Sequence, residues 1–410
     1  MSASSAVPVV ADRPPVLPEP PGPRALGLAH LDDGALHAAL TAARHAGDPL
    51  ADRTIEAFRA LPGGQGWRLL EDALTRGPAA LDDPALPQAL RELLASAAEA
   101  PPWLDLALVD AGVAAHWRMG IAAQTLALTY GSLAFGYQYG DLARPLAMTG
   151  RLERMAPRRV GETARWVLAA VAPGGMAPWA PGWASTIRVR LVHALVRDHL
   201  HRGGRWTDPE WGVPLSAAGL LATGIGGFLV VPYRAMRDLG LRATRADREA
   251  RTALWRWISH VMGAPTALLP ASWSEAERLV DVLEPLLGEP VEGSAELLDA
   301  LTAHGTPSAQ AAPGPAGWAL QRLTTAIGQA LTRRWMGAER ARELGVGGAP
   351  LDRLVPLARP IARAHQTLLA TGIVGAELRS AELQIAFLTR FLDRIGSPAA
   401  TVSPAEATAR

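Results

Sequence analysis

The chain has 410 residues, a formal net charge of +1 and 49% hydrophobic residues, which suffices for one large domain or two ordinary ones. It contains no cysteine, which excludes disulfides, zinc–thiolate sites, iron–sulfur clusters and haem held by a thiolate. All 40 cationic side chains are arginine, so Schiff-base chemistry and a P-loop lysine are excluded as well. The near-zero net charge predicts no general attraction to nucleic acid.

The chain begins with a segment rich in proline, alanine and valine. Residues 1–27 lack the cationic region followed by an apolar region that marks a signal peptide, so we expect a flexible leader. A cytoplasmic location is the corresponding expectation, or a secreted one if a native leader is missing from this sequence. The first predicted helices cover residues 31–60, with a break at Gly47-Asp48-Pro49, and then residues 66–76 and 87–98.

The centre of the chain is more apolar. Consecutive helices are predicted over residues 104–119, 120–135, 158–171, 186–202, 245–262 and 273–287. Residues 215–231 carry no charge, but this stretch is slightly short for a membrane span and contains four glycines. A buried core helix is therefore the preferred interpretation, with no transmembrane span, and the glycines would allow a neighbouring helix or a flat cofactor to approach closely.

Two long helices are predicted over residues 319–344 and 351–392, after a linker at 306–318 and before a disordered tail at 393–410. Alternation typical of strands is nearly absent. The sequence therefore predicts an all-α fold, with a single helical domain over residues 28–392. It gives no prediction of the oligomeric state.

The helix predicted over Thr186–Arg202 carries the most unusual pattern of side chains. At about 100° per residue, Arg190, His193 and Arg197 fall within about 60° of arc, and apolar residues cover the other side. One interpretation is a buried histidine inside a network of arginines and carboxylates. The other is an anionic cofactor such as haem b, whose iron binds the imidazole and whose carboxylates bind the guanidinium groups.

A second stretch places Arg159, Glu162, Thr163 and Trp166 on one helical face by their spacing. A surface Arg–Glu pair near a helix start is the simpler interpretation. Alternatively, these polar groups face a haem from the side opposite His193. Of the remaining histidines, His199 and His201 are expected at the surface and His260 in the core.

Six short segments follow one another along the chain between about residues 45 and 390. They are Gly47–Asp52, Thr149–Leu152, Arg188–Arg197, Glu210–Pro214, Trp255–Pro265 and Leu268–Pro270. In this order they resemble the latex-clearing proteins (rubber oxygenases) and the wider family of MpaB-like oxygenases, and the helix Arg188–Arg197 is the most specific of them.

The resemblance implies a globin-like helical core with additional helices around a buried haem b, and cleavage of a carbon–carbon double bond by O₂. It makes His193 the proximal iron ligand and makes Arg190 and Arg197 the partners of the haem propionates. It places Arg159 and Thr163 on the distal side, where they would stabilise the bound oxygen.

The chain also departs from the pattern of that family. Glu162 stands where the rubber oxygenases have a distal lysine, so no lysine amine can close the sixth position of the iron. The catalytic base could be Asp141 or Glu162. Because no export signal is visible, a smaller olefin or isoprenoid is expected in place of rubber.

The sequence therefore predicts a haem-dependent oxygenase of the dioxygenase type that acts on an apolar alkene. Two alternatives remain open. The same fold could carry out a different haem-dependent oxidation or a rearrangement in natural-product metabolism, or the protein could be a haem-binding sensor or carrier without turnover.

Overall fold

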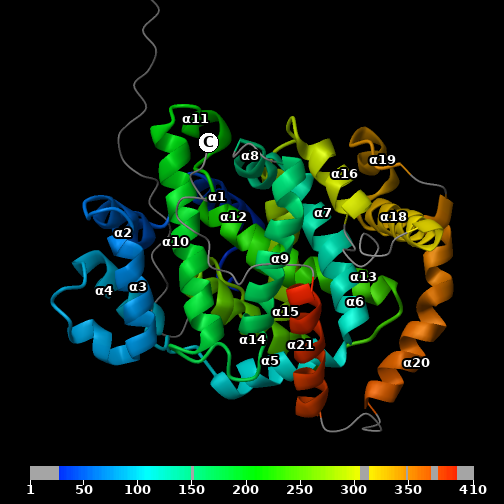
Figure 1. Ribbon diagram of the computed structural model, residues 1–410, viewed down its shortest axis with the longest axis horizontal. Helices are drawn as coiled ribbons and strands as arrows, with labels where there is room; N and C mark the ends of the chain where they lie inside the picture. The colour runs from blue at the N-terminus through cyan, green and yellow to red at the C-terminus, as the bar shows by residue number, and fades with distance from the viewer. Residues whose placement is uncertain (1–26, 149–151, 305–313, 348–349, 371–376, 395–410) are drawn as a thin grey trace, which may run out of the picture.

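The computed structural model describes residues 27–148, 152–304, 314–347, 350–370 and 377–394. Within these ranges all regular elements are helices and no strand occurs, so the predicted all-α fold is confirmed (Figure 1). The predicted leader (apart from residue 27), most of the predicted linker and nearly all of the predicted tail lie outside the described residues. Residues 314–318 of the predicted linker belong to a helix.

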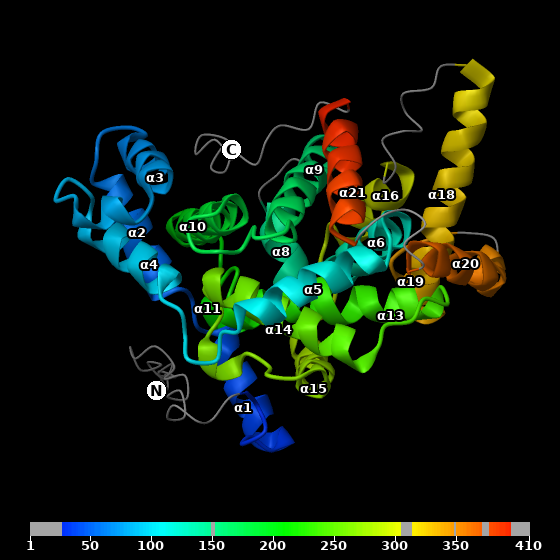
Figure 2. The ribbon, with the colours of Figure 1, turned by 90° about the horizontal axis from the view of Figure 1, so that it is seen from below.

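Helices α2, α3 and α4 gather at one end of the molecule, whereas α1 packs on α12 and α15 (Figure 2). The break at Gly47-Asp48-Pro49 is confirmed, because Asp48 accepts a hydrogen bond from the backbone N–H of Ala51 and thereby caps α2. The elements are α1 (Asp33–Arg44), α2 (Pro49–Arg59), α3 (Gln65–Arg76), the 3₁₀ helix η1 (Gly77–Asp82) and α4 (Gln88–Ala98).

The apolar centre folds into two further groups of helices. The first group is α5 (Leu106–Arg118), α6 (Ile121–Leu126), the π-helix η2 (Ala127–Leu133), α7 (Ala134–Tyr137), α8 (Gly140–Met148) and α9 (Leu152–Ala170). The second is α10 (Pro181–Arg202), α11 (Asp208–Trp211), α12 (Ala217–Leu221), the π-helix η3 (Ala222–Val230) and α13 (Val231–Asp238). Helix α8 was not predicted from the sequence.

Helix α10 begins five residues before the predicted start at Ser185/Thr186. Pro181 occupies the first turn, where its fixed φ and missing N–H are compatible with a helix. The helix predicted over residues 215–231 likewise extends further than predicted, to Asp238. Pro232 does not end it, because this proline lies in the first turn of α13, where a missing N–H is tolerated. The segment Ala217–Asp238 is long and apolar enough to cross a membrane, but 72% of its most apolar window is buried inside the protein, which is typical of a core helix.

The last third of the chain has more breaks than the sequence predicts. The helix expected at 319–344 is interrupted at Gly337, and the helix expected at 351–392 begins with a 3₁₀ segment that contains Pro356. Residues 371–376 of the second helix lie outside the described residues. The elements are α14 (Arg245–Val261), η4 (Thr266–Leu268), α15 (Trp273–Leu283), η5 (Glu284–Leu286), α16 (Ser294–His304), α18 (Gly314–Met336), α19 (Ala338–Glu343), η6 (Pro350–Ala358), α20 (Arg359–Ala370) and α21 (Glu377–Arg394).

The most extensive helix pair in the core is α5 against α14, which lie side by side (Figure 2). Gly112 makes this close approach possible, since a Cβ atom there would lie 2.3 Å from the backbone oxygen of Ala250. Helix α14 also packs on η3 and on α10, and α10 packs on α9 and α2. Helices α9, α10, α14 and η3 therefore meet in the interior, where the residues singled out by the sequence lie.

Candidate functional site

Arg190 of α10 forms a buried ion pair with Asp48 of α2. Its Nε and one terminal nitrogen lie 2.6 and 3.0 Å from the two carboxylate oxygens, and its other terminal nitrogen donates to the carbonyl of Val261. Arg190 is only 6% exposed and Asp48 only 5%. The fork-to-fork geometry is the strongest form of an arginine–carboxylate contact.

Arg197 repeats this arrangement two turns further along α10. Its Nε and a terminal nitrogen lie 2.9 and 2.6 Å from one oxygen of Asp52, and its remaining terminal nitrogen donates to the carbonyl of Leu215. Burial raises the pKa of the Asp52 carboxyl, while Arg197 acts in the opposite direction. Carboxylates four residues apart on α2 thus pair with arginines seven residues apart on α10.

These contacts are the arginine–carboxylate network that the sequence offers as one interpretation of α10. Both guanidinium groups, Arg190 and Arg197, already have a carboxylate partner within the chain. Their role toward haem propionates stays a prediction, and it would require their remaining N–H groups or an exchange of partners. The network itself does not decide what His193 does.

His193 lies between the two arginines on α10. Its Nδ1 atom is buried and has no hydrogen-bond partner among the described residues. Burial lowers the pKa of its imidazole to about 4, and the neighbouring Arg197 contributes in the same direction. The ring is therefore neutral at pH 7, which is the state in which histidine binds a metal.

Helix α9 runs antiparallel to α10 and carries the second set of predicted residues. The indole Nε1 of Trp166 donates to the hydroxyl of Thr186 at 3.0 Å, and the backbone of Ala169 lies against Gly182. Because the helices are antiparallel, one turn back along α9 from Trp166 matches one turn forward along α10 from Thr186. One turn places Thr163 level with position 190, and two turns place position 159 level with His193.

Thr163 and Glu162 are both partly buried in this part of α9. The backbone of residue 159 belongs to the helix, but the placement of the Arg159 side chain lies outside what the structure describes. The relative position of α9 and α10 is thus consistent with the prediction that these residues face His193, while their catalytic roles stay predictions.

Aromatic side chains form one wall beside these helices. Phe228 of η3 stacks on Trp255 of α14 with ring centroids 5.0 Å apart, and Trp166 packs edge-on against both rings. The indole nitrogen of Trp255 and the hydroxyl of Ser259, one turn later on the same face of α14, are buried without a partner among the described residues. Unpaired buried polar atoms of this kind indicate a place where a ligand or water is bound.

Asp141, the other predicted base, lies at the start of α8. It accepts hydrogen bonds from two nitrogens of Arg44 at 2.7 and 2.9 Å and so links α8 to α1. The contact gives Asp141 a structural role, because it joins two helices that are about 100 residues apart in the sequence. The choice between Asp141 and Glu162 as the catalytic base stays a prediction.

Sequence reasoning missed the partners of the α10 arginines. Asp48 and Asp52 belong to a segment that carries the family resemblance, but no local pattern pairs them with arginines more than 140 positions away. Their spacing by one helical turn was the available signal. His260 lies in the core as predicted, with Nδ1 3.0 Å from the hydroxyl of Thr266, whereas His201 is exposed and pairs with Asp208.

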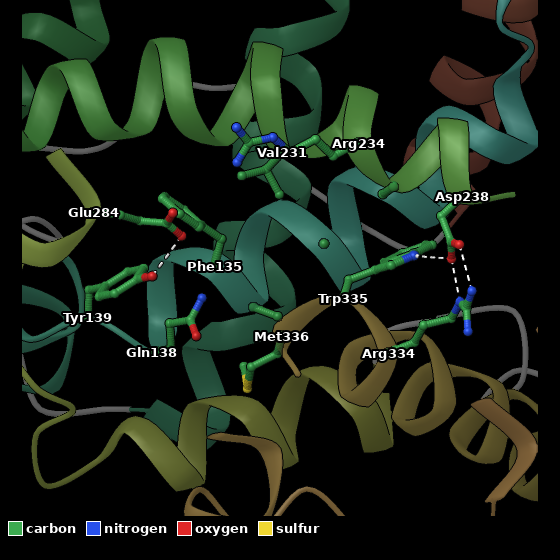
Figure 3. Close-up of a pocket in the computed structure, with 13 residues that line it drawn as sticks. Phe135, Gln138, Tyr139, Val231, Arg234, Asp238, Glu284, Arg334, Trp335 and Met336 are labelled. Carbon is green, nitrogen blue, oxygen red and sulfur yellow. Dashed lines mark hydrogen bonds and ion pairs between the residues drawn. The ribbon is translucent and has the colours of Figure 1, made fainter. Parts of the chain in front are cut away.

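A separate cavity of about 460 Å³ lies between η2, α7, α13, η5 and α18. Figure 3 shows Tyr139 bonded to Glu284 on one side of it, and Arg334 and Trp335 bonded to Asp238 on the other. No residue that the sequence predicts to be functional lines this cavity. Its polar groups largely satisfy one another.

The all-helical fold with these paired helices has a close counterpart among solved structures. A structure of latex clearing protein in the closed state superposes with a TM-score of 0.64 and 21% sequence identity, covering 88% of this chain and 94% of that one. At this level of identity the likeness shows the fold.

A family model described as the catalytic domain of the ER-bound oxygenase mpaB/B′ and rubber oxygenase matches residues 112–368. The chain therefore belongs to this family, as its sequence resemblance predicts. It is also 29% identical over 296 residues to the rubber oxygenase of Streptomyces sp. (strain K30), an alignment that covers 67% of this chain and 65% of that protein.

Proposed function

We propose that this protein is a haem b-dependent oxygenase that uses O₂ to cleave a carbon–carbon double bond of an apolar olefinic or isoprenoid substrate. Family membership supports the oxygenase class. The observation that carries the haem assignment is His193, a neutral imidazole in the interior with a buried nitrogen that lacks a partner among the described residues.

The side chains around His193 fit a haem better than a bare metal ion. No group of three or more histidine, aspartate or glutamate side chains in the described ranges is arranged to hold a metal. A haem needs only one axial ligand from the protein, because the porphyrin supplies four nitrogens. The stacked Phe228 and Trp255 offer a flat aromatic wall, and haem, once bound, would supply the oxygen chemistry.

The residues of α9 would act on the reactants from the opposite side. The hydroxyl of Thr163 and the guanidinium of Arg159 are hydrogen-bond donors, so they would stabilise partial negative charge as it develops on the oxygen reactant. Glu162 would take up an allylic proton from the substrate or position it. The aromatic and aliphatic residues of η3 and α14 would exclude water and hold the apolar chain.

The substrate class follows from the relative named rubber oxygenase and from the apolar interior. We propose an olefinic or isoprenoid chain, from small molecules to polyisoprene. Scission by a dioxygenase would place one oxygen atom of O₂ on each of two carbonyl products. Mass spectrometry of products formed under isotope-labelled O₂ tests this. Label in only one product, or in a hydroxyl group, would indicate a different oxidation.

The haem assignment is tested by replacing His193 with alanine. We expect the purified wild-type protein to show the absorption of haem near about 400 nm and a haem b pyridine haemochrome spectrum. His193→Ala should lose most of the haem, because the axial bond is removed. His201→Ala on the same helix is the matched control and should keep it, since His201 is exposed and paired with Asp208.

Circular dichroism and thermal melting show whether each variant folds. A folded His193→Ala protein with full haem occupancy would refute the ligand assignment. A wild-type protein that binds no haem when haem is added would refute the proposed function as a whole.

A further inference from the structure

The segment formed by η6 and α20 has its apolar side on the outside. Leu354, Leu357, Ile361 and Leu368 follow one another at spacings of three, four and seven residues, so they lie on one face. Their exposed fractions are 54%, 71%, 74% and 52%. A surface helix normally turns such a stripe toward the core.

The opposite face of α20 binds the protein largely through polar groups. Arg359 donates to the backbone and side-chain oxygens of Asp238, and Arg363 donates to the carbonyl of Gly240. Gln366 exchanges two hydrogen bonds with the backbone of Arg242. Gly240 allows this close approach, since it has a φ of +97° and a Cβ there would lie 2.8 Å from Arg359. These contacts fix which face of α20 points outward.

Asp352 of η6 is the one acidic residue in the described part of the segment, and it pairs with Arg333. No aspartate or glutamate occurs between residues 353 and 376, whereas Arg353, Arg359 and Arg363 do. Arg353 is exposed beside the apolar stripe. An exposed apolar stripe flanked by arginine, with no acidic residue along it, is the pattern of helices that lie in the boundary between lipid head groups and acyl chains.

We propose that the outer face of η6 and α20 is a docking surface for an anionic lipid layer. The lipid acyl region would bury Leu354, Leu357, Ile361 and Leu368, while Arg353 would contact the anionic head groups. A second copy of the chain fits less well, because a symmetric contact would bring the arginines of the two copies together. This inference does not depend on the haem chemistry.

Flotation of the full-length protein with vesicles tests the proposal. The protein should bind vesicles of equimolar phosphatidylcholine and phosphatidylglycerol, bind phosphatidylcholine alone more weakly, and be released as salt is added. The double variant Leu357→Ser/Ile361→Ser should weaken binding at least about tenfold, because it removes two large apolar side chains that the lipid would bury. Arg353→Gln should weaken binding to the anionic vesicles by about fivefold.

The matched control is the double variant Leu383→Ser/Phe387→Ser on α21. These residues are 57% and 63% exposed but follow Glu382, and binding should be unchanged. The proposal is overturned if the wild type does not float with anionic vesicles, or if the α20 double variant floats as well as the wild type. It is also overturned if ultracentrifugation without lipid shows a dimer that the α20 variant abolishes. If the double variant fails to fold, binding of Arg353→Gln to the anionic vesicles decides the question, and unchanged binding of this variant overturns the proposal.

Discussion

At the scale of single residues, the two arginine–aspartate pairs of α10 differ mainly in how far water reaches the carboxylate. The side chain of Asp48 is 5% exposed, whereas that of Asp52 is 40% exposed. A buried charge that loses its partner is far more costly than an exposed one, because water cannot replace the lost contact. The first pair should therefore matter much more for stability than the second.

This difference predicts unequal effects of two matched substitutions. Asp48→Asn should lower the free energy of unfolding by about 3–5 kcal/mol, because it leaves Arg190 charged and buried. Asparagine can still cap α2, so the loss reports on the ion pair. Asp52→Asn also leaves a buried guanidinium, that of Arg197, but water reaches position 52 and the carbonyl of Leu215 still accepts a hydrogen bond from Arg197, so the loss should be smaller, about 1–3 kcal/mol. Urea denaturation of both variants measures this, and equal losses would show that burial does not govern these pairs.

At the same scale, the sequence predicts which residue types share a face but not which partner each one takes. The spacing of Arg190, His193 and Arg197 on one side of α10 is a property of helical geometry and needs no further information. The two aspartate partners come from a different helix, so only the packing of α2 against α10 identifies them. Two interpretations of these arginines therefore remain after sequence analysis, and the structure shows the carboxylate network.

At the scale of the helices, most segments were predictable because local rules decide them. The break at Gly47-Asp48-Pro49, the other glycine and proline breaks and the apolar periodicity correctly predict the helices up to residue 98 and the pair α14 and α15. The long C-terminal helices were predicted wrongly. Their periodicity continues through Gly337 and Pro356, where the backbone changes direction to pack η6 on α18.

The contact between α5 and α14 predicts a strong effect of a small substitution. Gly112→Ala places a Cβ 2.3 Å from the backbone oxygen of Ala250, so the helices must move apart. We expect a loss of about 1–3 kcal/mol in the free energy of unfolding. Gly136→Ala in α7 is the control, because its Cβ would meet nothing within 4 Å, and it should be neutral or stabilising. Thermal or urea denaturation compares the two, and equal effects would contradict the role given to Gly112.

At the scale of the whole molecule, buried histidines predict how stability depends on pH. Burial lowers the pKa of His193 and of His260 to about 4, and it lowers the pKa of His116 well below its ordinary value. After unfolding these groups return to a pKa of about 6.5. The unfolded chain thus binds more protons below that pH, so stability present above about pH 6.5 is lost progressively between 6.5 and 4.

The expected slope is up to about 1.4 kcal/mol per pH unit for each buried histidine. His116→Gln should remove one such contribution, because glutamine has a similar size and does not titrate. Urea denaturation between about pH 7 and pH 5 compares the slopes of the wild type and the variant. Identical slopes would mean that His116 does not take up a proton on unfolding.

The sequence by itself determined that this protein is all-α, that one helix presents histidine between two arginines, and that the chain resembles the rubber oxygenases. These features depend on local periodicity and on the order of short segments along the chain. Only the tertiary structure decided that Asp48 and Asp52 neutralise the arginines, that Asp141 is held by Arg44, and that α20 turns its apolar side outward. Each depends on contacts between residues about 100 or more positions apart, which no local pattern records.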